Sequence, residues 1–352
     1  MKKLLAILLC AIFILPALSA CGETGGEGGG CGHAVTVKAT YTEEGGKVYK
    51  EYYCGTCAKD IKEQITVAGI VDEENELTAI QESKDFQNNS TILIKKGTYS
   101  TMYVTDAKIG TKIVCEDDVI VKILRFEADS AEITVENMNF YSPSTESASR
   151  LDINGLVSGL TIKYCTFKGN SQVYAYSQLA QDFSIENCTF TDIYNNSGSG
   201  MSLTAILVRN FDGLAVKDCV FENVQYNALQ IGAKGGVGDL IITGNTFKNI
   251  GSRVLHTVSS EPAFCDISGN TFYKNSVGSG SYFNTNGFGS FTIGVNTWES
   301  IPPKENFYIN PVTAGRIQPR RTNSIRLKKS LSKVRKAFSF FIKQVQLLLV
   351  MI

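Results

Sequence analysis

Three cysteines and one histidine near the N-terminus have the spacing of a metal-binding set. Cys31-Gly-His33 is followed by Cys54-Gly-Thr-Cys57 in the 352-residue chain. Three thiolates and one imidazole are a complete tetrahedral set for zinc, and the two-residue gap in the second pair directs both sulfurs to one ion. Because four protein ligands leave no open position, we expect a structural zinc without metal catalysis. Disulfides among these cysteines are one alternative in an exported chain, and free thiols are another.

A second group of polar side chains could bind sugars. In "ENVQYNALQIG" and "KNIGSRVLHTV", inward Leu229 and Leu255 would leave Gln230 and His256 pointing outward and stacked in successive repeats. This surface would offer hydrogen bonds to sugar hydroxyls and an aromatic ring for a pyranose face. An ordinary polar face without a ligand is the alternative. The predicted ligand-binding residues are Tyr226, Gln230, Arg253, His256 and Asn284.

Acidic residues do not form a catalytic cluster in the sequence. Glu136, Lys163, Glu186 and Lys217 occupy equivalent outward positions and alternate in sign, which is typical of an ion ladder on a solvated sheet. A glutamate between two lysines lacks a second carboxylate for general acid–base work. We therefore assign no catalytic residue, although loops from neighbouring repeats could still assemble a site.

The elements that position these side chains follow from a repeat. A large aromatic residue recurs at intervals of 27, 23, 31, 26, 25 and 26 residues, and apolar residues stand five and seven positions before it. The two apolar positions share parity, so they lie on one face of a strand. A repeat of this length that contains strands predicts a solenoid in which each coil buries its inward face by stacking. The aromatic residues are Phe140, Phe167, Phe190, Phe221, Phe247, Phe272 and Trp298.

The position two residues before the aromatic changes from cysteine to asparagine along the chain. Asparagine at a bend can bond to the backbone and to the next asparagine in the stack, and cysteine there is a small buried apolar side chain. A disulfide staircase is the alternative, but stacked side chains point the same way and do not converge as a disulfide requires. The column is Met138, Cys165, Cys188, Cys219, Asn245, Asn270 and Asn296.

The "GTY" start and the repeated "NTF" units, as in "ITGNTFKNI" and "ISGNTFYKN", resemble those of pectin-lyase-like right-handed parallel β-helices. The resemblance implies an all-β, single-stranded solenoid over residues 77–300, with a short capping helix that contains Leu77, Ile80 and Phe86. Members of that family include polysaccharide lyases, glycoside hydrolases and non-catalytic adhesins. The lyases hold calcium on clustered carboxylates.

The first thirty residues indicate export. Lys2 and Lys3 precede a short apolar run, and Leu18-Ser19-Ala20-Cys21 resembles the lipobox of bacterial lipoproteins, which implies cleavage before Cys21 and its acylation. A simple secretory signal with a chance cysteine is the alternative. The anchor would place the chain on the extracytoplasmic face of the cell membrane. Residues 1–20 would be the signal peptide and residues 21–30 a flexible tether.

Residues 31–60 are predicted to be a small Cys/His module, with two strands around Glu43-Glu44-Gly45-Gly46. The segment resembles small modules on surface proteins of Gram-positive bacteria, which end in a similar "YCGTC". Residues 61–76 would then be a linker to the solenoid.

Charge is distributed unevenly along the chain. Residues 316–352 contain ten Lys or Arg and no acidic residue, so 24 basic and 34 acidic residues remain elsewhere, a net charge of −10. We expect no nucleic-acid partner, because no basic patch with interleaved aromatics occurs outside this tail. Residues 301–352 form a basic amphipathic tail that could cap the rod, lie on an anionic membrane or be an unnatural gene end.

These features favour a surface lipoprotein whose β-helix binds carbohydrate or another surface partner without catalysis. The alternative is a polysaccharide lyase or glycoside hydrolase that acts on an extracellular polysaccharide, with calcium as cofactor if it is a lyase.

Overall fold

The structure is a computed structural model, and its description covers ten segments of the chain. Cys21, Cys31, His33 and Cys57 lie outside these segments, as do the signal peptide, the tether and residues 312–352, so the predictions made for them remain predictions. No helix in the described part is long and apolar enough to cross a membrane. The described segments are residues 38–54, 58–127, 129–175, 179–195, 204–232, 236–257, 264–273, 283–288, 291–299 and 307–311.

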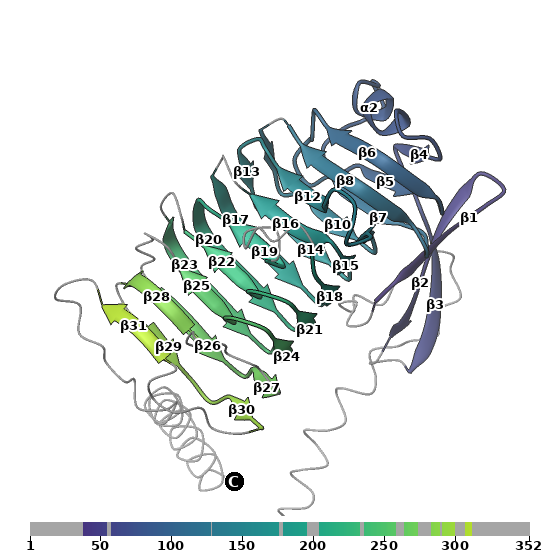
Figure 1. Ribbon diagram of the computed structural model, residues 1–352. Coiled ribbons are helices and arrows are strands. Elements are labelled where there is room, and N and C mark those ends of the chain that lie inside the picture. The colour runs from purple at the N-terminus through teal and green to yellow at the C-terminus, as the bar shows by residue number, and fades with distance from the viewer. Residues whose placement is uncertain are drawn as a thin grey trace, which may run out of the picture.

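Most of the described chain winds into a parallel β-helix, as the sequence predicts (Figure 1). One sheet has twelve strands, and all of its pairings are parallel. Its strands are β4 (Gly69–Val71), β5 (Thr91–Ile94), β7 (Lys112–Cys115), β9 (Ser130–Ala131), β10 (Thr134–Glu136), β13 (Val157–Ser158), β14 (Thr161–Lys163), β17 (Ala180–Glu186), β20 (Phe211–Lys217), β23 (Gly236–Thr243), β26 (Phe264–Ser268) and β29 (Phe291–Ile293).

A sixteen-stranded sheet forms the other two sides of the rod, and β8 (Ile120–Phe126) joins them because it pairs with both β11 and β12. β6 (Thr98–Val104) pairs with β8 at the N-terminal end. The aromatic flank contains β11 (Asn139–Ser142), β15 (Thr166–Gly169), β18 (Thr189–Ile193), β21 (Val220–Val224), β24 (Thr246–Ile250), β27 (Thr271–Tyr273) and β30 (Thr297–Trp298). The polar flank contains β12 (Ser149–Ile153), β16 (Ser171–Ala175), β19 (Ile206–Val208), β22 (Leu229–Ile231), β25 (Leu255–Thr257), β28 (Phe283–Phe288) and β31 (Phe307–Pro311).

The predicted aromatic file runs down the interior of the rod. Phe190 and Phe221 stack with ring centroids 4.7 Å apart and nearly parallel planes, and Phe247 follows at 4.9 Å. All six phenylalanines of the file are at most 2% exposed. Each ring lies over the ring of the next coil because successive coils pair in register, as at Phe190 and Phe221. The file ends at Trp298, 4.1 Å from Phe272.

Six of the seven coils bend immediately before the Cys/Asn column at a residue with a left-handed backbone conformation. This residue has φ of 53° at Asp218 and 72° at Gly244. The left-handed residue turns the chain by a sharp angle, so the following side chain points into the rod in spite of its parity. The column is therefore buried, as predicted. The equivalent left-handed residues in the other coils are Asn137, Tyr164, Asn187 and Gly269.

The asparagines of the column form the predicted ladder. The Asn245 amide donates to Asn270 Oδ1 at 3.0 Å, and the Asn270 amide donates to Asn296 Oδ1 at 3.1 Å. Asn270 also donates to the carbonyl oxygen of Ile242 at 2.8 Å. The side chains thus satisfy buried backbone groups at a bend where strand pairing is interrupted.

The cysteines of the column are buried free thiols, and the predicted absence of a disulfide staircase is confirmed. Cys219 Sγ accepts a hydrogen bond from the backbone N–H of Cys188 at 3.4 Å. Sulfur therefore takes the place that an asparagine oxygen takes in later coils, where Asn245 Oδ1 accepts from the N–H of Cys219.

Thiol labelling can test this burial. We expect Cys165, Cys188 and Cys219 to resist alkylation in the native protein, because each is 1% exposed and burial raises the pKa of the Cys188 thiol well above its usual value. In denaturant all three should react without prior reduction. Mass spectrometry of the labelled peptides gives the result, and a disulfide between any two of the three would contradict the stacked geometry.

The N-terminal end of the rod is covered by the predicted helix, α2 (Glu76–Gln81), which contacts β4 and β6. Leu77 and Phe86 are buried in the core, and Ile80 is partly buried against it. The helix is shorter than the amphipathic stretch suggests, so Phe86 reaches the core from the turn after it. Gln81 bridges helix and rod by donating to the carbonyl oxygens of Leu77 and Tyr103.

A separate antiparallel sheet contains β1 (Thr40–Glu44), β2 (Lys47–Cys54) and β3 (Lys59–Ile65). The predicted hairpin turns at Gly45 and Gly46, both with positive φ, as a two-residue turn between twisted strands requires. The expectation of a linker over residues 61–76 is wrong, because this segment contains the end of β3, all of β4 and the start of α2. The short apolar runs of this segment pair with neighbouring strands, and composition alone does not reveal such pairing.

This small sheet packs against the twelve-stranded sheet. Ala39, Tyr41 and Val48 form a buried cluster with Leu93 and Val114, which point outward from the rod. The Tyr41 hydroxyl donates to Glu136 Oε2 at 2.7 Å, and the Asn137 amide donates to the Ala39 carbonyl oxygen at 2.6 Å. Burial, together with Glu136, raises the pKa of Tyr41. The sheet is thus fixed to the rod by apolar contacts and directed hydrogen bonds.

Candidate functional site

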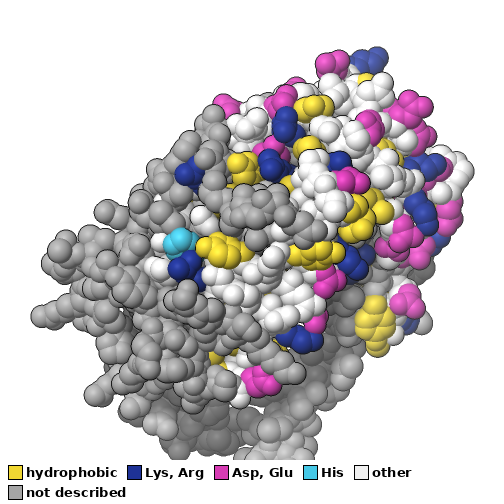
Figure 2. All heavy atoms as spheres, in the orientation of Figure 1, with side chains coloured by type: hydrophobic (Ala, Val, Ile, Leu, Met, Phe, Trp, Pro, Cys, Tyr) yellow, Lys and Arg dark blue, Asp and Glu magenta, His cyan; other side chains and the backbone are white. Residues whose placement is uncertain are grey.

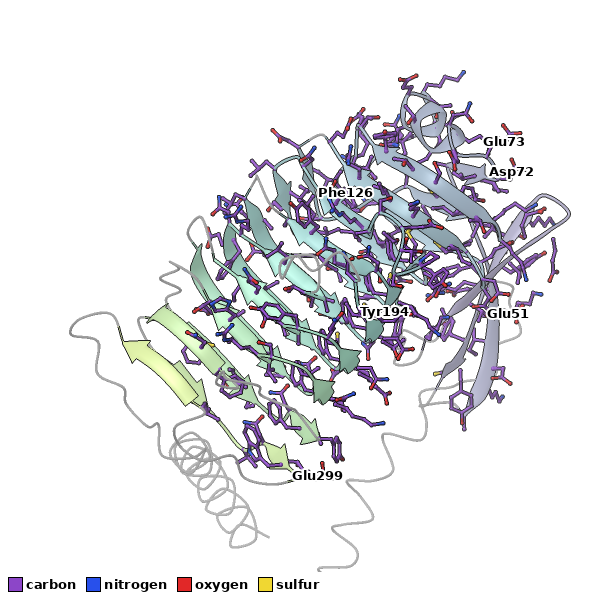
Figure 3. All side chains as sticks on the ribbon, viewed as in Figure 1. Glu51, Asp72, Glu73, Phe126, Tyr194 and Glu299 are labelled. Atoms are coloured by element: carbon purple, nitrogen blue, oxygen red, sulfur yellow. The ribbon has the colours of Figure 1, made fainter. Side chains whose placement is uncertain are left out.

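The candidate site is an outward row of side chains on the polar flank. Pairing in register places one such residue in each of six successive coils. Its members change from charged to apolar and then to uncharged polar residues along the rod, and two of them, Asp152 and Leu207, are buried at 5% and 1% exposure. Figure 3 shows the side chains along this flank, where the labelled Phe126 lies at the end of β8, one coil before β12. The row is Asp152, Tyr174, Leu207, Gln230, His256 and Asn284.

The structure brings together three of the predicted ligand-binding residues. Gln230, His256 and Asn284 are direct neighbours in β22, β25 and β28. The residues on either side of Gln230 and His256 are fully buried, so these two side chains point outward as predicted. Each of the three is partly exposed. They form a continuous polar surface that spans three coils.

Arg253 and Tyr226 lie at the corner before this row. The N–H of Ala228 donates to the Arg253 carbonyl oxygen, and the N–H of Ser252 donates to that of Tyr226, both at 2.9 Å. This pairing places Arg253 beside Asn227, whose amide donates to Gln230 Oε1 at 3.2 Å. Arg253 therefore belongs to the cluster around Gln230 and His256. Tyr226 occupies the same corner one coil earlier, where its backbone pairs with Ser252.

His256 is a neutral group at neutral pH. Burial and the neighbouring positive charge of Arg253 lower its pKa to about 4. Its Nδ1 atom is buried and has no hydrogen-bond partner within the described part of the chain. A buried polar atom without a partner costs free energy unless a ligand or water satisfies it. Figure 2 shows the single coloured histidine beside a basic side chain on this face.

A pH titration can test this environment. We expect the His256 pKa to be about 4, below the ordinary histidine value of 6.5, and Arg253→Gln to raise it because the neighbouring positive charge is removed. The pKa of His256 is lower in the folded state than in the unfolded state. Its contribution to the free energy of unfolding is therefore complete above pH 6.5 and is lost as the pH falls toward 4, because the unfolded chain takes up the proton first. Ring-proton chemical shifts in a His33→Gln background give the titration, and an unshifted pKa would contradict the buried position.

Three features of the site were not predicted. Asn227 is 0% exposed, and its Oδ1 atom has no partner among the described residues. The Arg150 guanidinium stacks 4.6 Å from the centre of the Tyr174 ring. Arg125 Nε donates to Asp152 Oδ2 at 3.0 Å. The outward positions of Arg150 and Asp152 could have been predicted from the alternation in "SRLDI", because Leu151 and Ile153 point inward.

The carboxylates do not form a catalytic pair. Asp152 is the only acidic residue in strands β12 to β28 of the polar flank, and Arg125 neutralises it. On the twelve-stranded sheet, Glu186 lies 3.6 Å from Lys163 and 3.7 Å from Lys217, as the predicted ladder requires. Burial acts to raise the Glu186 pKa, but the Ser184 hydroxyl and the two lysines outweigh it and lower the pKa. The fourth ladder residue, Glu136, accepts from Tyr41 instead.

The predicted zinc site can be followed at one ligand only. Cys54 ends β2 and is buried, whereas Cys31, His33 and Cys57 lie outside the described residues. Among the described residues no three His, Cys, Asp or Glu side chains are arranged to hold a metal ion. The zinc module therefore stays a prediction.

Comparison with known proteins agrees with the fold. Residues 126–288 match the family model described as "Right handed beta helix region". This range covers the aromatic file from Phe140 to Phe272 and the row on the polar flank, and Trp298 lies outside it. No curated protein matches the chain.

Proposed function

We propose that the chain, which is a right-handed parallel β-helix, binds carbohydrate on the polar flank without catalysing a reaction. The observation that carries this proposal is the register of Gln230, His256 and Asn284, which present hydrogen-bonding groups in three successive coils. The buried Asn227 Oδ1 and His256 Nδ1 atoms beneath this surface have no hydrogen-bond partner among the described residues. Tyr174 offers a half-exposed aromatic ring two coils before Gln230.

The distribution of charge favours binding over hydrolysis or elimination. A glycoside hydrolase needs two carboxyl groups on either side of the scissile bond. The outward row has one carboxylate, and Arg125 is paired with it. Among the described residues, no acidic neighbour acts on the neutral His256 to make it a general base.

The proposed location is the cell surface. Acylation of Cys21 would anchor the chain to the membrane and leave the rod outside the cell, where polysaccharides are accessible. The small Cys/His module would stand between the anchor and the rod. Mass spectrometry of the mature protein tests this part, because an unmodified N-terminus at a residue other than Cys21 would remove the anchor.

A polysaccharide screen with the purified chain tests the function, with and without calcium. We expect binding by the wild type and a loss of about tenfold or more in affinity for a Gln230→Ala/His256→Ala double variant, because each lost hydrogen bond to a ligand weakens binding by about 1 kcal/mol. Thr191→Ala on the aromatic flank is the matched control and should bind normally. New reducing ends or the absorbance of unsaturated products would instead identify an enzyme. Unchanged binding by the double variant would move the site elsewhere.

A further inference from the structure

The small antiparallel sheet has a strand edge that no described strand covers. Its order is β1–β2–β3, and within the described part of the chain β3 pairs only with β2. Figure 1 shows this sheet at the N-terminal end of the rod. An open edge presents backbone N–H and C=O groups that can pair with a strand of another chain. The edge of β3 is therefore a template for pairing, and its side chains determine which strand fits it.

The charges along β3 make the strand complementary to itself. Its first five residues are Lys59, Asp60, Ile61, Lys62 and Glu63. If a second copy pairs antiparallel with Ile61 opposite Ile61, each Lys59 lies opposite a Glu63 and each Asp60 lies opposite a Lys62. All four charged pairs then have opposite signs, which stabilises a sheet. A pair centred on Asp60 or on Lys62 would instead place like charges opposite each other, so the charges favour one register.

A second copy in this register would continue the alternation of charge that β2 and β3 already show. Glu63 lies opposite Lys50 of β2, with the charged atoms 3.4 Å apart, and Lys62 lies opposite Glu51 at 2.9 Å. The two rows are on opposite faces of the sheet, because neighbouring residues of a strand point to opposite sides. The second copy would add the positive Lys59 beyond Glu63 in one row and the neighbouring aspartate beyond Lys62 in the other. Both rows would then alternate in sign across three strands.

Two charges of β3 have no charged partner inside the described part of the chain. Lys59 and Asp60 are exposed, and neither forms an ion pair there. Across β2 they lie opposite Cys54 and Tyr53, which carry no compensating charge. Ile61, the apolar residue that follows them, is partly exposed. The residues that the fold leaves without a charged or apolar partner are thus the ones that a second copy would cover.

We propose that two copies of the chain associate through β3 across a two-fold axis at Ile61, so that their small sheets join into one continuous antiparallel sheet. The same residues of both copies meet in such a contact, which closes after two chains. This inference does not depend on the proposed carbohydrate binding, because the small sheet packs on the twelve-stranded sheet and its free edge belongs to neither flank of the other sheet. One short strand from each copy makes a small interface, so we expect a reversible dimer with a Kd of about 1–100 μM.

Analytical ultracentrifugation of the full chain over a range of concentrations tests the association. We expect a wild-type dimer that weakens as salt is raised. Lys59→Glu/Asp60→Lys leaves the net charge and the ion pairs between β2 and β3 unchanged, but it makes all four pairs across the axis like-charged. This variant should weaken the dimer by about tenfold or more. Lys84→Asp/Asp85→Lys exchanges two exposed charges after α2 and is the matched control, which should dimerise within about twofold of the wild type.

A mixture of two variants tests the register. Lys62→Glu/Glu63→Lys also makes all four pairs like-charged and should not dimerise by itself. Mixed with Lys59→Glu/Asp60→Lys it should form a heterodimer, because every pair between the two variants has opposite signs. Thermal unfolding verifies the fold of each variant, since the second one also gives up ion pairs with β2.

Cross-linking locates the axis without any change of charge. In Ile61→Cys the two Cα atoms would be about 4.5–5.5 Å apart, which lies within the range that a disulfide spans. Mild oxidation by dissolved oxygen with a copper catalyst should therefore join the two chains. Gln64→Cys is the control on the same strand, because its two copies would be roughly 20 Å apart. Non-reducing gel electrophoresis compares both variants with the wild-type background.

Three results would overturn the proposed dimer. The first is a wild-type chain that remains monomeric well above about 100 μM. The second is a dimer that persists undiminished in a folded Lys59→Glu/Asp60→Lys variant. The third is equal cross-linking of Ile61→Cys and Gln64→Cys, which would place any contact between copies elsewhere. None of these results bears on carbohydrate binding, which the polysaccharide screen tests separately.

Discussion

Phe221→Ala is expected to lower the free energy of unfolding by about 3–5 kcal/mol, the largest effect among the substitutions considered. Phe221 is 0% exposed and stacks between Phe190 at 4.7 Å and Phe247 at 4.9 Å. Alanine would remove apolar area and leave a cavity inside a stack that neighbouring coils hold apart. Urea unfolding followed by circular dichroism measures the change.

Val220→Ala is the matched control, because Val220 is the adjacent residue of β21 and is 37% exposed. Val220→Ala should lower the free energy of unfolding by less than about 1 kcal/mol, since folding withdraws little apolar area from water at that position. Similar losses for the two variants would mean that Phe221 does not face the interior. The repeat would then have been assigned to the wrong face of the strand.

Asn270→Ala should lower the free energy of unfolding by about 2–4 kcal/mol, because it leaves buried polar groups without partners at about 1–3 kcal/mol each. Asn270 Oδ1 accepts from the backbone N–H of Asn245 at 2.9 Å, and its amide donates to the Ile242 carbonyl oxygen at 2.8 Å. Both groups lie in the interior, where water does not replace the lost bonds. Urea unfolding again supplies the measurement.

Asn270→Cys provides the comparison for the ladder. Cys219 occupies the same column, where its sulfur accepts from a backbone N–H and donates to the Lys217 carbonyl oxygen at 3.2 Å. Cysteine at position 270 should therefore retain part of the stability that alanine loses. If alanine and cysteine are equivalent, or if Asn270→Ala has no effect, the ladder does not carry the stability assigned to it.

The fold was predictable because one pattern recurs many times. A single coil gives a weak signal, but the seven aromatic positions and the paired apolar positions before them agree on a single register, and the structure places Phe190 opposite both Phe167 and Phe221. Each coil packs chiefly on its neighbours, so local periodicity determines the long-range contacts. The change from cysteine to asparagine was also readable, because both residue types fit one buried bend.

The site was predictable only where the repeat extends into it. Gln230 and His256 follow the alternation around their buried neighbours, so their outward stacking could be derived. Asn227 could not, because it lies at a corner where the alternation stops and its burial depends on tertiary packing. The Tyr41–Glu136 hydrogen bond joins residues 95 positions apart, and no periodicity links them.

The regular spacing of the coils links the stability of the rod to its proposed function. The inward files hold the coils at a fixed spacing, and this spacing sets the distance between successive outward side chains on the polar flank. A polymer that lies along the axis would therefore meet one coil after another at nearly constant intervals. Damage to the aromatic file should weaken ligand binding by loosening this spacing, even though the file belongs to the strands of the aromatic flank.

A crystal structure of the chain with a bound oligosaccharide from a polymer that binds tests the central claim most directly. We predict sugar units over Gln230, His256 and Asn284 of the outward row, parallel to the rod axis, with the phenylalanine file inside the coils. Sugars bound across the aromatic flank, or phenylalanines of the file in contact with solvent, would contradict it.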